Sequence, residues 1–178
     1  MNRLHTQPIS EATSPAAQIY SAIKGSIGMV PNAYVGIGSN SPFALEAGLN
    51  LDAALKKGTL SGQEQEAIKL VLSQASECEY CLAAHTTISK LHGLSEDAIK
   101  ALRYGQPSGN AKHDALAKFT RRLVGSKGSL PEDALHAVRQ AGFTDAQIVD
   151  TILAITSITF TNLFNRVNNT VLDFPPAQ

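Results

Sequence analysis

The amino-acid sequence predicts an all-α fold. Helix start signals recur along its 178 residues, either as serine before proline or as serine or threonine followed three residues later by glutamate or glutamine. The apolar residues after these signals have the spacing of one helix face. No stretch alternates apolar and polar residues for long enough to require a strand, although residues 152–160 are rich in residue types that favour strands.

The chain is expected to form a flexible N-terminal arm over residues 1–12 and a single helical domain over residues 13–178. Within the domain, segment 27–40 contains three glycines and Pro31, which predicts either a short helix or a packed loop. The helices that we expect begin at a cap or proline signal, or at an apolar face, and end near a glycine or a loop. They cover residues 14–25, 41–58, 61–75, 76–92, 95–104, 113–124, 131–141 and 144–169.

The helical pattern contains a weak internal repeat. A shift of 83 residues places the capped helix at Ser61 on the one at Thr144. If the repeat is a duplication, it is degenerate, because the second copy carries no cysteine. Two helical halves would then share one core.

Composition and charge exclude several functional classes. The chain has 15 Lys and Arg and 15 Asp and Glu residues, for a formal net charge of zero, so no basic surface predicts binding to nucleic acid or to an anionic membrane. The first ten residues lack the pattern of a signal peptide, and no uninterrupted apolar run is long enough to cross a bilayer. We therefore expect a cytoplasmic protein.

Both cysteines of the chain lie in one short motif, C-x-x-C-x-x-x-H, formed by Cys78, Cys81 and His85. At about 100° per residue on a helix, these side chains point to about 0°, 300° and 340° and share one narrow face. Ser76 with Glu79 predicts a capping box that places the cysteines in the first turns of a helix. There the helix dipole favours a thiolate, and His85 is near enough to bond Cys81 or accept its proton.

Three interpretations of this motif are open. In a reducing compartment a lone Cys-x-x-Cys pair is more often catalytic or metal-binding than structural, which favours a reactive dithiol. A zinc site is the main rival, since Cys78, Cys81 and His85 suffice for a catalytic zinc ion with an open position, although a structural zinc ion would need a fourth ligand. The third interpretation makes the cysteines inert core residues.

The motif and its surroundings resemble the alkylhydroperoxidase AhpD-like branch of the carboxymuconolactone decarboxylase superfamily. In that pattern a glutamate, here Glu66, is followed by eleven residues and then by the motif that starts at Cys78. Residues 60–94 are similar to the family core, and residues 27–32 and 165–166 resemble flanking segments of its peroxidase-related members. The resemblance implies an AhpD-like helical bundle that forms a homo-oligomer, a trimer or a hexamer. The decarboxylase branch lacks the cysteine pair, so its activity is not expected.

The resemblance also implies roles for four residues. Cys81 would be the thiol that attacks peroxide, and Cys78 the resolving thiol that closes the disulfide. His85 and Glu66 would form a proton relay.

Helical periodicity alone treats the two candidate glutamates differently. It places Glu66 on a solvated face beside Lys69, where the two would form an ion pair. Glu64 falls within the apolar arc, although it is also the capping-box partner of Ser61. Either glutamate is therefore a candidate for the relay.

A polar cluster lies at the end of the last predicted helix. It predicts either a fraying helix terminus or a subunit contact or pocket wall. The cluster comprises Asn162, Asn165, Arg166, Asn168 and Asn169.

These inferences predict a thiol-dependent peroxidase. The Cys81 thiolate attacks the O–O bond, water or an alcohol leaves, and Cys78 condenses with the resulting sulfenic acid to form a disulfide. No flavin, haem or nucleotide motif is visible, so no cofactor is expected, and an external dithiol, either a protein or a small molecule, would supply the electrons. The alternatives are a non-catalytic redox sensor, a general disulfide oxidoreductase and a metal-dependent enzyme.

Overall fold

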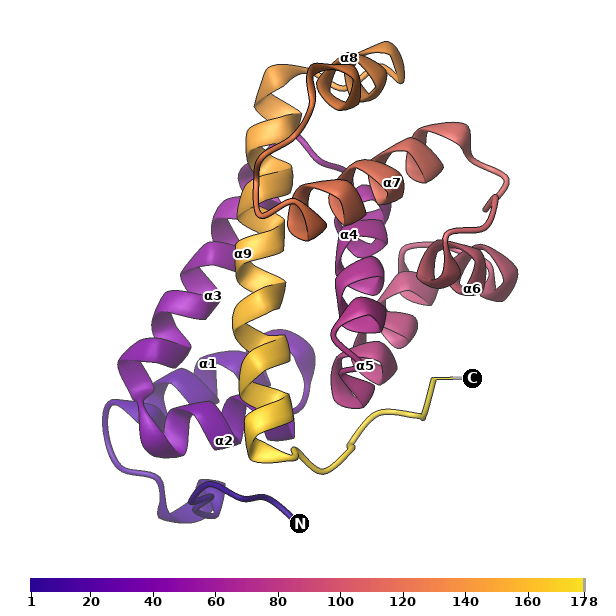
Figure 1. The fold of residues 1–178 in the computed structure, drawn as a ribbon. Helices are drawn as coiled ribbons and strands as arrows, with labels where there is room; N and C mark the ends of the chain where they lie inside the picture. Colours follow the sequence, from indigo (N-terminus) through magenta and orange to yellow (C-terminus); the bar gives the residue numbers. More distant parts are fainter. Residues whose placement is uncertain (178) are drawn as a thin grey trace.

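The computed structural model describes residues 1–177. Over this range it contains nine α-helices, one short 3-10 helix and no strand, which confirms the all-α fold class (Figure 1). The 3-10 helix is η1 (Ile9–Glu11). The α-helices are α1 (Ala16–Ile27), α2 (Asn32–Asn40), α3 (Pro42–Lys57), α4 (Gly62–Ala75), α5 (Glu79–Leu91), α6 (Glu96–Tyr104), α7 (Ala111–Gly125), α8 (Glu132–Gln140) and α9 (Asp145–Asn168).

Helix α9 runs through the middle of the bundle, with α3 along one side and α4 along the other (Figure 1). It begins with the predicted capping box of Thr144 and Gln147. It ends at Asn169, which has a left-handed φ of 52°, a conformation that commonly ends helices. Its buried residues recur every three or four positions, so one face of the helix lies in the core. They are Thr151, Ala154, Ser157, Ile158, Asn162, Asn165 and Asn168.

The core that holds the two cysteines is built mainly by α4, α5, α7 and α9, with further residues from α2, α3 and α8. Ile68, Leu116 and Ile158 are buried in it beside Cys78 and Cys81. Burying one large aliphatic side chain contributes about 1.5–3 kcal/mol to folding. This packing fixes the chain segment that carries the cysteines.

The structure corrects the predicted bounds of the first helix. Ser14 makes no capping hydrogen bond, and Pro15 occupies the N-cap position. The helix also continues through Gly25 and ends at Gly28, whose φ is 81°. Glycine adopts this left-handed conformation without steric cost, so Gly28 is the better helix terminator. Segment 27–40 contains a helix, α2, as one of its two interpretations predicted.

The N-terminal residues contact the C-terminal end of α9. The backbone N–H of Arg3 donates to the carbonyl oxygen of Asn168 at 2.7 Å, and that of Leu4 donates to Asn168 Oδ1 at 3.0 Å. The backbone N–H of Gln7 also donates to Ser39 Oγ of α2 at 3.2 Å, so residues 1–12 are attached to the bundle at more than one point. The flexibility of this arm and the single domain over residues 13–178 stay predictions.

Helix α9 also bears on the expectation that no segment can span a bilayer. By length and composition alone it is apolar enough to cross a membrane, and it is the only helix of residues 1–177 that is. However, it packs against α2, α3, α4 and α5, and its buried face includes three asparagines. These contacts make α9 a central helix of the bundle.

Candidate redox site

The two cysteines lie at the junction between α4 and α5, and the structure corrects the predicted start of α5. The capping box of Ser76 and Glu79 is wrong, because the backbone N–H of Ser76 bonds the carbonyl oxygen of Leu72 and continues the hydrogen bonding of α4. Glu77 then reverses the chain with a positive φ of 52°. Helix α5 starts at Glu79, with Cys78 as its N-cap residue.

Cys78 and Cys81 form a disulfide in which their Cα atoms are 5.3 Å apart. The backbone N–H of Cys81 donates to Cys78 Sγ at 3.3 Å, so the sulfur itself caps the helix. Both cysteines are buried, with 1% and 2% of their surface exposed. A thiolate formed here faces the unpaired N–H groups and the positive end of the α5 dipole, which favour its negative charge.

Glu66 lies in the core rather than on the solvated face that periodicity predicted, because only 3% of it is exposed. Its Oε2 is 2.8 Å from His85 Nδ1, and its Oε1 is 3.8 Å from Lys69 Nζ. Burial alone raises the pKa of the Glu66 carboxyl, but His85 and Lys69 outweigh it and leave the pKa below its usual value. Glu66 is therefore ionised, and His85 donates its Nδ1 proton to it.

Glu64, the other candidate for the relay, is bonded elsewhere. Its Oε2 accepts the backbone N–H of Ser61 at 2.8 Å, which completes the predicted capping box. Its Oε1 is 2.8 Å from Lys112 Nζ. Of the two glutamates, the structure brings Glu66 to His85.

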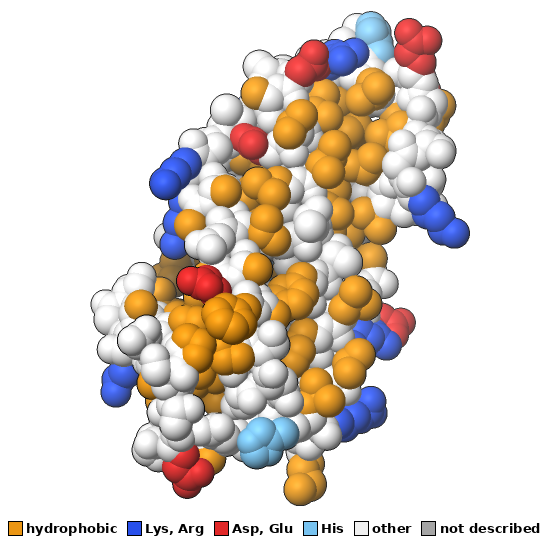
Figure 2. All heavy atoms as spheres, turned by 90° about the vertical axis from the view of Figure 1, so that its left-hand side faces the viewer, with side chains coloured by type: hydrophobic (Ala, Val, Ile, Leu, Met, Phe, Trp, Pro, Cys, Tyr) orange, Lys and Arg blue, Asp and Glu red, His pale blue; other side chains and the backbone are white. Residues whose placement is uncertain are grey.

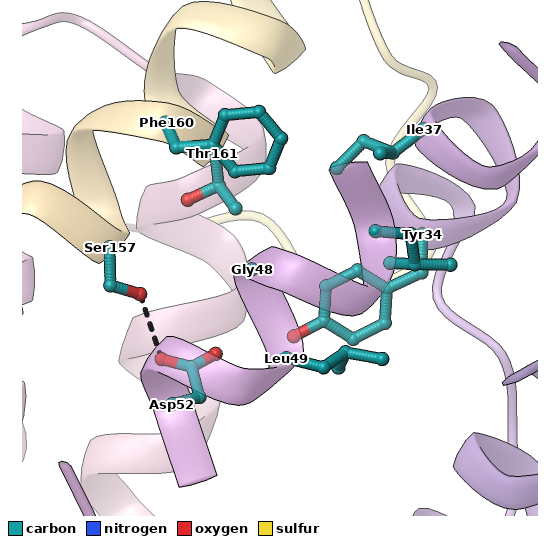
Figure 3. Close-up of a pocket in the computed structure, with 9 residues that line it drawn as sticks. Tyr34, Ile37, Gly48, Leu49, Asp52, Ser157, Phe160 and Thr161 are labelled. Atoms are coloured by element: carbon teal, nitrogen blue, oxygen red, sulfur yellow. Dashed lines mark hydrogen bonds between the residues drawn. The ribbon is translucent and has the colours of Figure 1, made fainter. Parts of the chain in front are cut away.

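The ion pairs continue from Glu66 towards α3. Lys69 Nζ is 3.7 Å from Asp52 Oδ1, and Ser157 Oγ donates to the same oxygen at 2.8 Å (Figure 3). A cavity of about 10 Å³ adjoins Asp52. Burial, and then the charge of Asp52, raise the pKa of the neighbouring Tyr34 to about 12. The cavity has room for about one water molecule, so it does not suit a substrate.

A cavity of about 640 Å³ opens at the α4–α5 junction. Cys78 lines it, whereas Cys81 does not, so the disulfide adjoins the cavity through Cys78. Its charged lining residues are balanced in sign. They are Arg3, Glu77, Glu79 and Arg166.

Helix α9 supplies a residue to the site that the motif did not reveal. Asn165 is 4% exposed, and its Nδ2 donates to Cys81 Sγ at 3.4 Å. Asn162 and Asn168 are also buried, so a fraying terminus is the wrong interpretation for these asparagines. A sequence signal did exist, since Asn162 and Asn165 continue the helical spacing of buried Ala154 and Ile158.

Tyr80 lies between the two cysteines in the motif and is buried. Its hydroxyl oxygen accepts the backbone N–H of Ala33 at 3.2 Å, and its ring packs edge-on against Phe174. Burial raises the pKa of the hydroxyl far above its usual value, so the group is protonated at neutral pH. Tyr80 therefore joins α5 to α2.

The bonds made by Cys78, Cys81 and His85 affect whether these residues can bind zinc. Within residues 1–177 no group of three His, Cys, Asp or Glu side chains is placed to hold a metal ion. The two sulfurs are bonded to each other, and His85 Nδ1 is bonded to Glu66. A zinc ion on these residues would require the disulfide to open first.

The fold and the site define a class of protein: an all-helical bundle with a buried Cys-x-x-Cys pair at the start of a helix and a glutamate–histidine pair that joins this helix to the preceding one. The model of the carboxymuconolactone decarboxylase family matches residues 44–108, which include Glu66, both cysteines and His85. This match supports the resemblance to the AhpD-like branch of that superfamily that the sequence predicted.

Three known proteins are similar to this chain. The uncharacterised protein YdfG of Bacillus subtilis (strain 168) is 25% identical over 134 residues, which are 72% of this chain and 86% of YdfG. The structure is similar to a peroxidase-related AhpD-core protein of Ralstonia eutropha JMP134, with a TM-score of 0.86 and 20% identity over 97% of this chain and 92% of that one. It is also similar to the apo debrominase Bmp8, with a TM-score of 0.78 and 16% identity over 96% and 92% of the two chains. At such identities the structural likeness shows a shared fold.

Proposed function

We propose that the protein is a thiol-dependent peroxidase that cycles Cys78 and Cys81 between dithiol and disulfide. The observation that carries the proposal is the position of the cysteine pair, which is at bonding distance at the start of α5, with the hydrogen-bonded Glu66–His85 pair one helical turn beyond Cys81. Its relatives include proteins described as peroxidase-related. We further propose a cytoplasmic location and no resident cofactor, in keeping with the balanced charge and the motifs of the sequence.

In the proposed cycle, the Cys81 thiolate attacks one oxygen of the peroxide. The O–O bond breaks, the sulfur becomes a sulfenic acid, and the other oxygen takes a proton and leaves as water or an alcohol. The Cys78 thiolate then attacks the sulfenic sulfur, hydroxide leaves as water, and the disulfide forms. An external dithiol returns two electrons and two protons through thiol–disulfide exchange.

His85 and Glu66 serve as the proton relay in this proposal. The ionised Glu66 holds the Nδ1 proton of His85, which fixes the tautomer and leaves Nε2 available for proton exchange. His85 lies one helical turn beyond Cys81, so the two side chains share a face of α5. The imidazole can thus take the thiol proton and later return it to the leaving oxygen.

A homo-oligomer, a trimer or a hexamer, is part of the proposal. Large apolar side chains on one stripe of α9 are exposed in the monomer: Val149, Ile152, Leu163 and Val167. Hydrophobic side chains also gather over the α3 side of the molecule (Figure 2), where Phe43 is 71% exposed. Extended apolar surface of this kind is uncommon on monomers and typical of protein contacts.

A turnover assay tests the proposed function. Hydrogen peroxide or an organic hydroperoxide is mixed with the protein and excess dithiothreitol, and peroxide loss is followed. We expect many peroxides to be consumed per chain, and none above background for Cys81→Ser. A redox sensor would consume about one peroxide per chain and stop. A general disulfide oxidoreductase would instead reduce a disulfide substrate without consuming peroxide.

The debrominase relative motivates a second arm of this assay. A cysteine-to-alanine variant of Bmp8 was solved in complex with 2,3,4-tribromopyrrole. The same mixture with 2,3,4-tribromopyrrole in place of peroxide should release no bromide. The proposed reaction would be contradicted if this mixture released bromide and the first mixture consumed no peroxide.

A further inference from the structure

Asn165 contacts a reacting sulfur from outside the motif. It belongs to α9, 84 residues beyond Cys81 in the sequence, and its Nδ2 is 3.4 Å from Cys81 Sγ. The side chain is buried, so its N–H dipole acts in a medium of low polarity, where hydrogen bonds to a charged sulfur are strong. Asn165 also lines the open cavity beside Cys78.

The amide oxygen of Asn165 is buried and has no hydrogen-bond partner within residues 1–177. The other buried asparagines of α9 differ in this respect. Asn162 Oδ1 accepts from Ser73 Oγ at 3.4 Å, and Asn168 Oδ1 accepts the backbone N–H of Leu4. Buried amide oxygens are rarely left without a donor. An unpartnered oxygen beside a redox sulfur points to a donor that is bound during the reaction.

We propose that Asn165 is a catalytic residue with two functions. Its N–H stabilises the Cys81 thiolate, and its Oδ1 accepts the O–H of a bound hydroperoxide. The second function rests on the peroxidase activity proposed above, whereas the first does not. The substrate class is accordingly a hydroperoxide, whose O–H can supply the hydrogen-bond donor that Asn165 Oδ1 lacks.

The chemistry keeps this hydrogen bond throughout oxygen transfer. The thiolate of Cys81 attacks the hydroxyl oxygen of ROOH, the S–O bond forms as the O–O bond breaks, and RO⁻ leaves and is protonated. The same O–H, now part of the sulfenic acid, still donates to Asn165 Oδ1. Holding the hydroxyl oxygen in this way orients it for attack. The amide thereby binds both the substrate and the product of the step.

The test isolates Cys81 by placing every variant in a Cys78→Ser background. The pH dependence of alkylation by iodoacetamide, which is uncharged, reports the thiolate. Loss of the N–H donor in Asn165→Ala and Asn165→Leu should raise the alkylation midpoint by about one pH unit, and single-turnover oxidation by hydrogen peroxide should slow about 10- to 100-fold. These variants leave the charged groups around the site unchanged. Those groups are Arg3, Glu66, Glu77, Glu79, His85 and Arg166.

Asn162→Ala is the matched control, since it removes a buried amide one turn away on the same helix that bonds Ser73 rather than the cysteine. It should lower stability but leave the alkylation midpoint and the oxidation rate unchanged. If both Asn165 variants behaved like this control, the proposal would be overturned. If the Asn165 variants raise the alkylation midpoint but the protein does not react with peroxide, the proposed thiolate function of Asn165 stands and the proposed peroxidase activity is refuted.

A second measurement needs no Asn165 substitution. In the Cys78→Ser protein, the side-chain amide NMR signal of Asn165 should shift with pH, with the same midpoint as the alkylation of Cys81. A shift at that midpoint supports the hydrogen bond to the thiolate even if the Asn165 variants fail to fold. A signal that does not move through the titration would overturn the proposal.

Discussion

The imidazole of His85 and the carboxylate of Glu66 meet across the interface of α4 and α5, with Nδ1 and Oε2 2.8 Å apart. Glu66 lies in the core and yet is ionised, because His85 and Lys69 compensate for its burial. The carboxylate therefore couples the stability of the fold to the protonation of the site.

The first prediction concerns the stability conferred by Glu66. Its pKa is lowered in the folded protein, so its contribution is present above its usual pKa of 4.5 and is lost as the pH falls through the folded value. Glu66→Gln should lower the free energy of unfolding by about 1–3 kcal/mol at pH 7, and the deficit should shrink below pH 4.5. Urea unfolding at several pH values measures both effects. The exposed Glu96, paired with Lys90, supplies the control Glu96→Gln, which should have little effect.

A second prediction addresses His85 as the partner of the Cys81 thiolate. In the Cys78→Ser background, His85→Ala should raise the pH midpoint of alkylation by about one unit, because an imidazolium beside the sulfur favours its charged form. His92→Ala, at the exposed end of the same helix, is the control and should leave the midpoint unchanged. Equal midpoints for the two variants would reduce His85 to a packing residue.

Subunit association is predicted to involve the exposed stripe of α9. Light scattering should give a mass that is a multiple of 18.9 kDa. Leu163→Glu places a charge on the stripe and should shift the protein towards the monomer, whereas Leu91→Glu, at a more exposed site on α5, should not. A monomeric wild-type protein at micromolar concentration would contradict the prediction, and an unchanged oligomer in Leu163→Glu would place the contact elsewhere.

The zinc alternative gives a prediction about the purified protein. Elemental analysis should find no stoichiometric zinc, and the mass of the air-oxidised chain should be two hydrogens below that of the reduced chain. Cα atoms 5.3 Å apart are suited to a disulfide. One tightly held metal ion per chain, lost in Cys78→Ser, would instead establish a metal site.

Local signals predicted most helices but failed where tertiary packing competed with them. The capping boxes at residues 61–64 and 144–147 are present as predicted, because each depends on atoms three residues apart. The box at residues 76–79 has the same pattern. It does not form, since the backbone N–H of Ser76 bonds Leu72 and extends α4. The sequence pattern does not reveal to which of two adjoining helices such a residue will hydrogen-bond.

The site was predictable to the extent that its residues lie in one motif. Cys81 and His85 are visible from their spacing, and family resemblance added Glu66, which periodicity alone had placed in solvent. Asn165 was recognised only as part of a polar cluster, because its contact with Cys81 depends on how α9 packs against α5. A single sequence does not encode that contact in any local spacing.

Peroxide is expected to oxidise Cys78 and Cys81 as one pair, and the proposed function depends most on this step. Titration of the fully reduced protein with hydrogen peroxide, without any reductant, tests it directly. We predict that one peroxide removes both thiols of a chain and that Cys78→Ser stops at a sulfenic acid on Cys81, which a dimedone-type probe labels. Cys81→Ser should not react. Retention of both thiols in excess peroxide, or a sulfenic acid trapped on Cys78 alone, would contradict the proposed cycle.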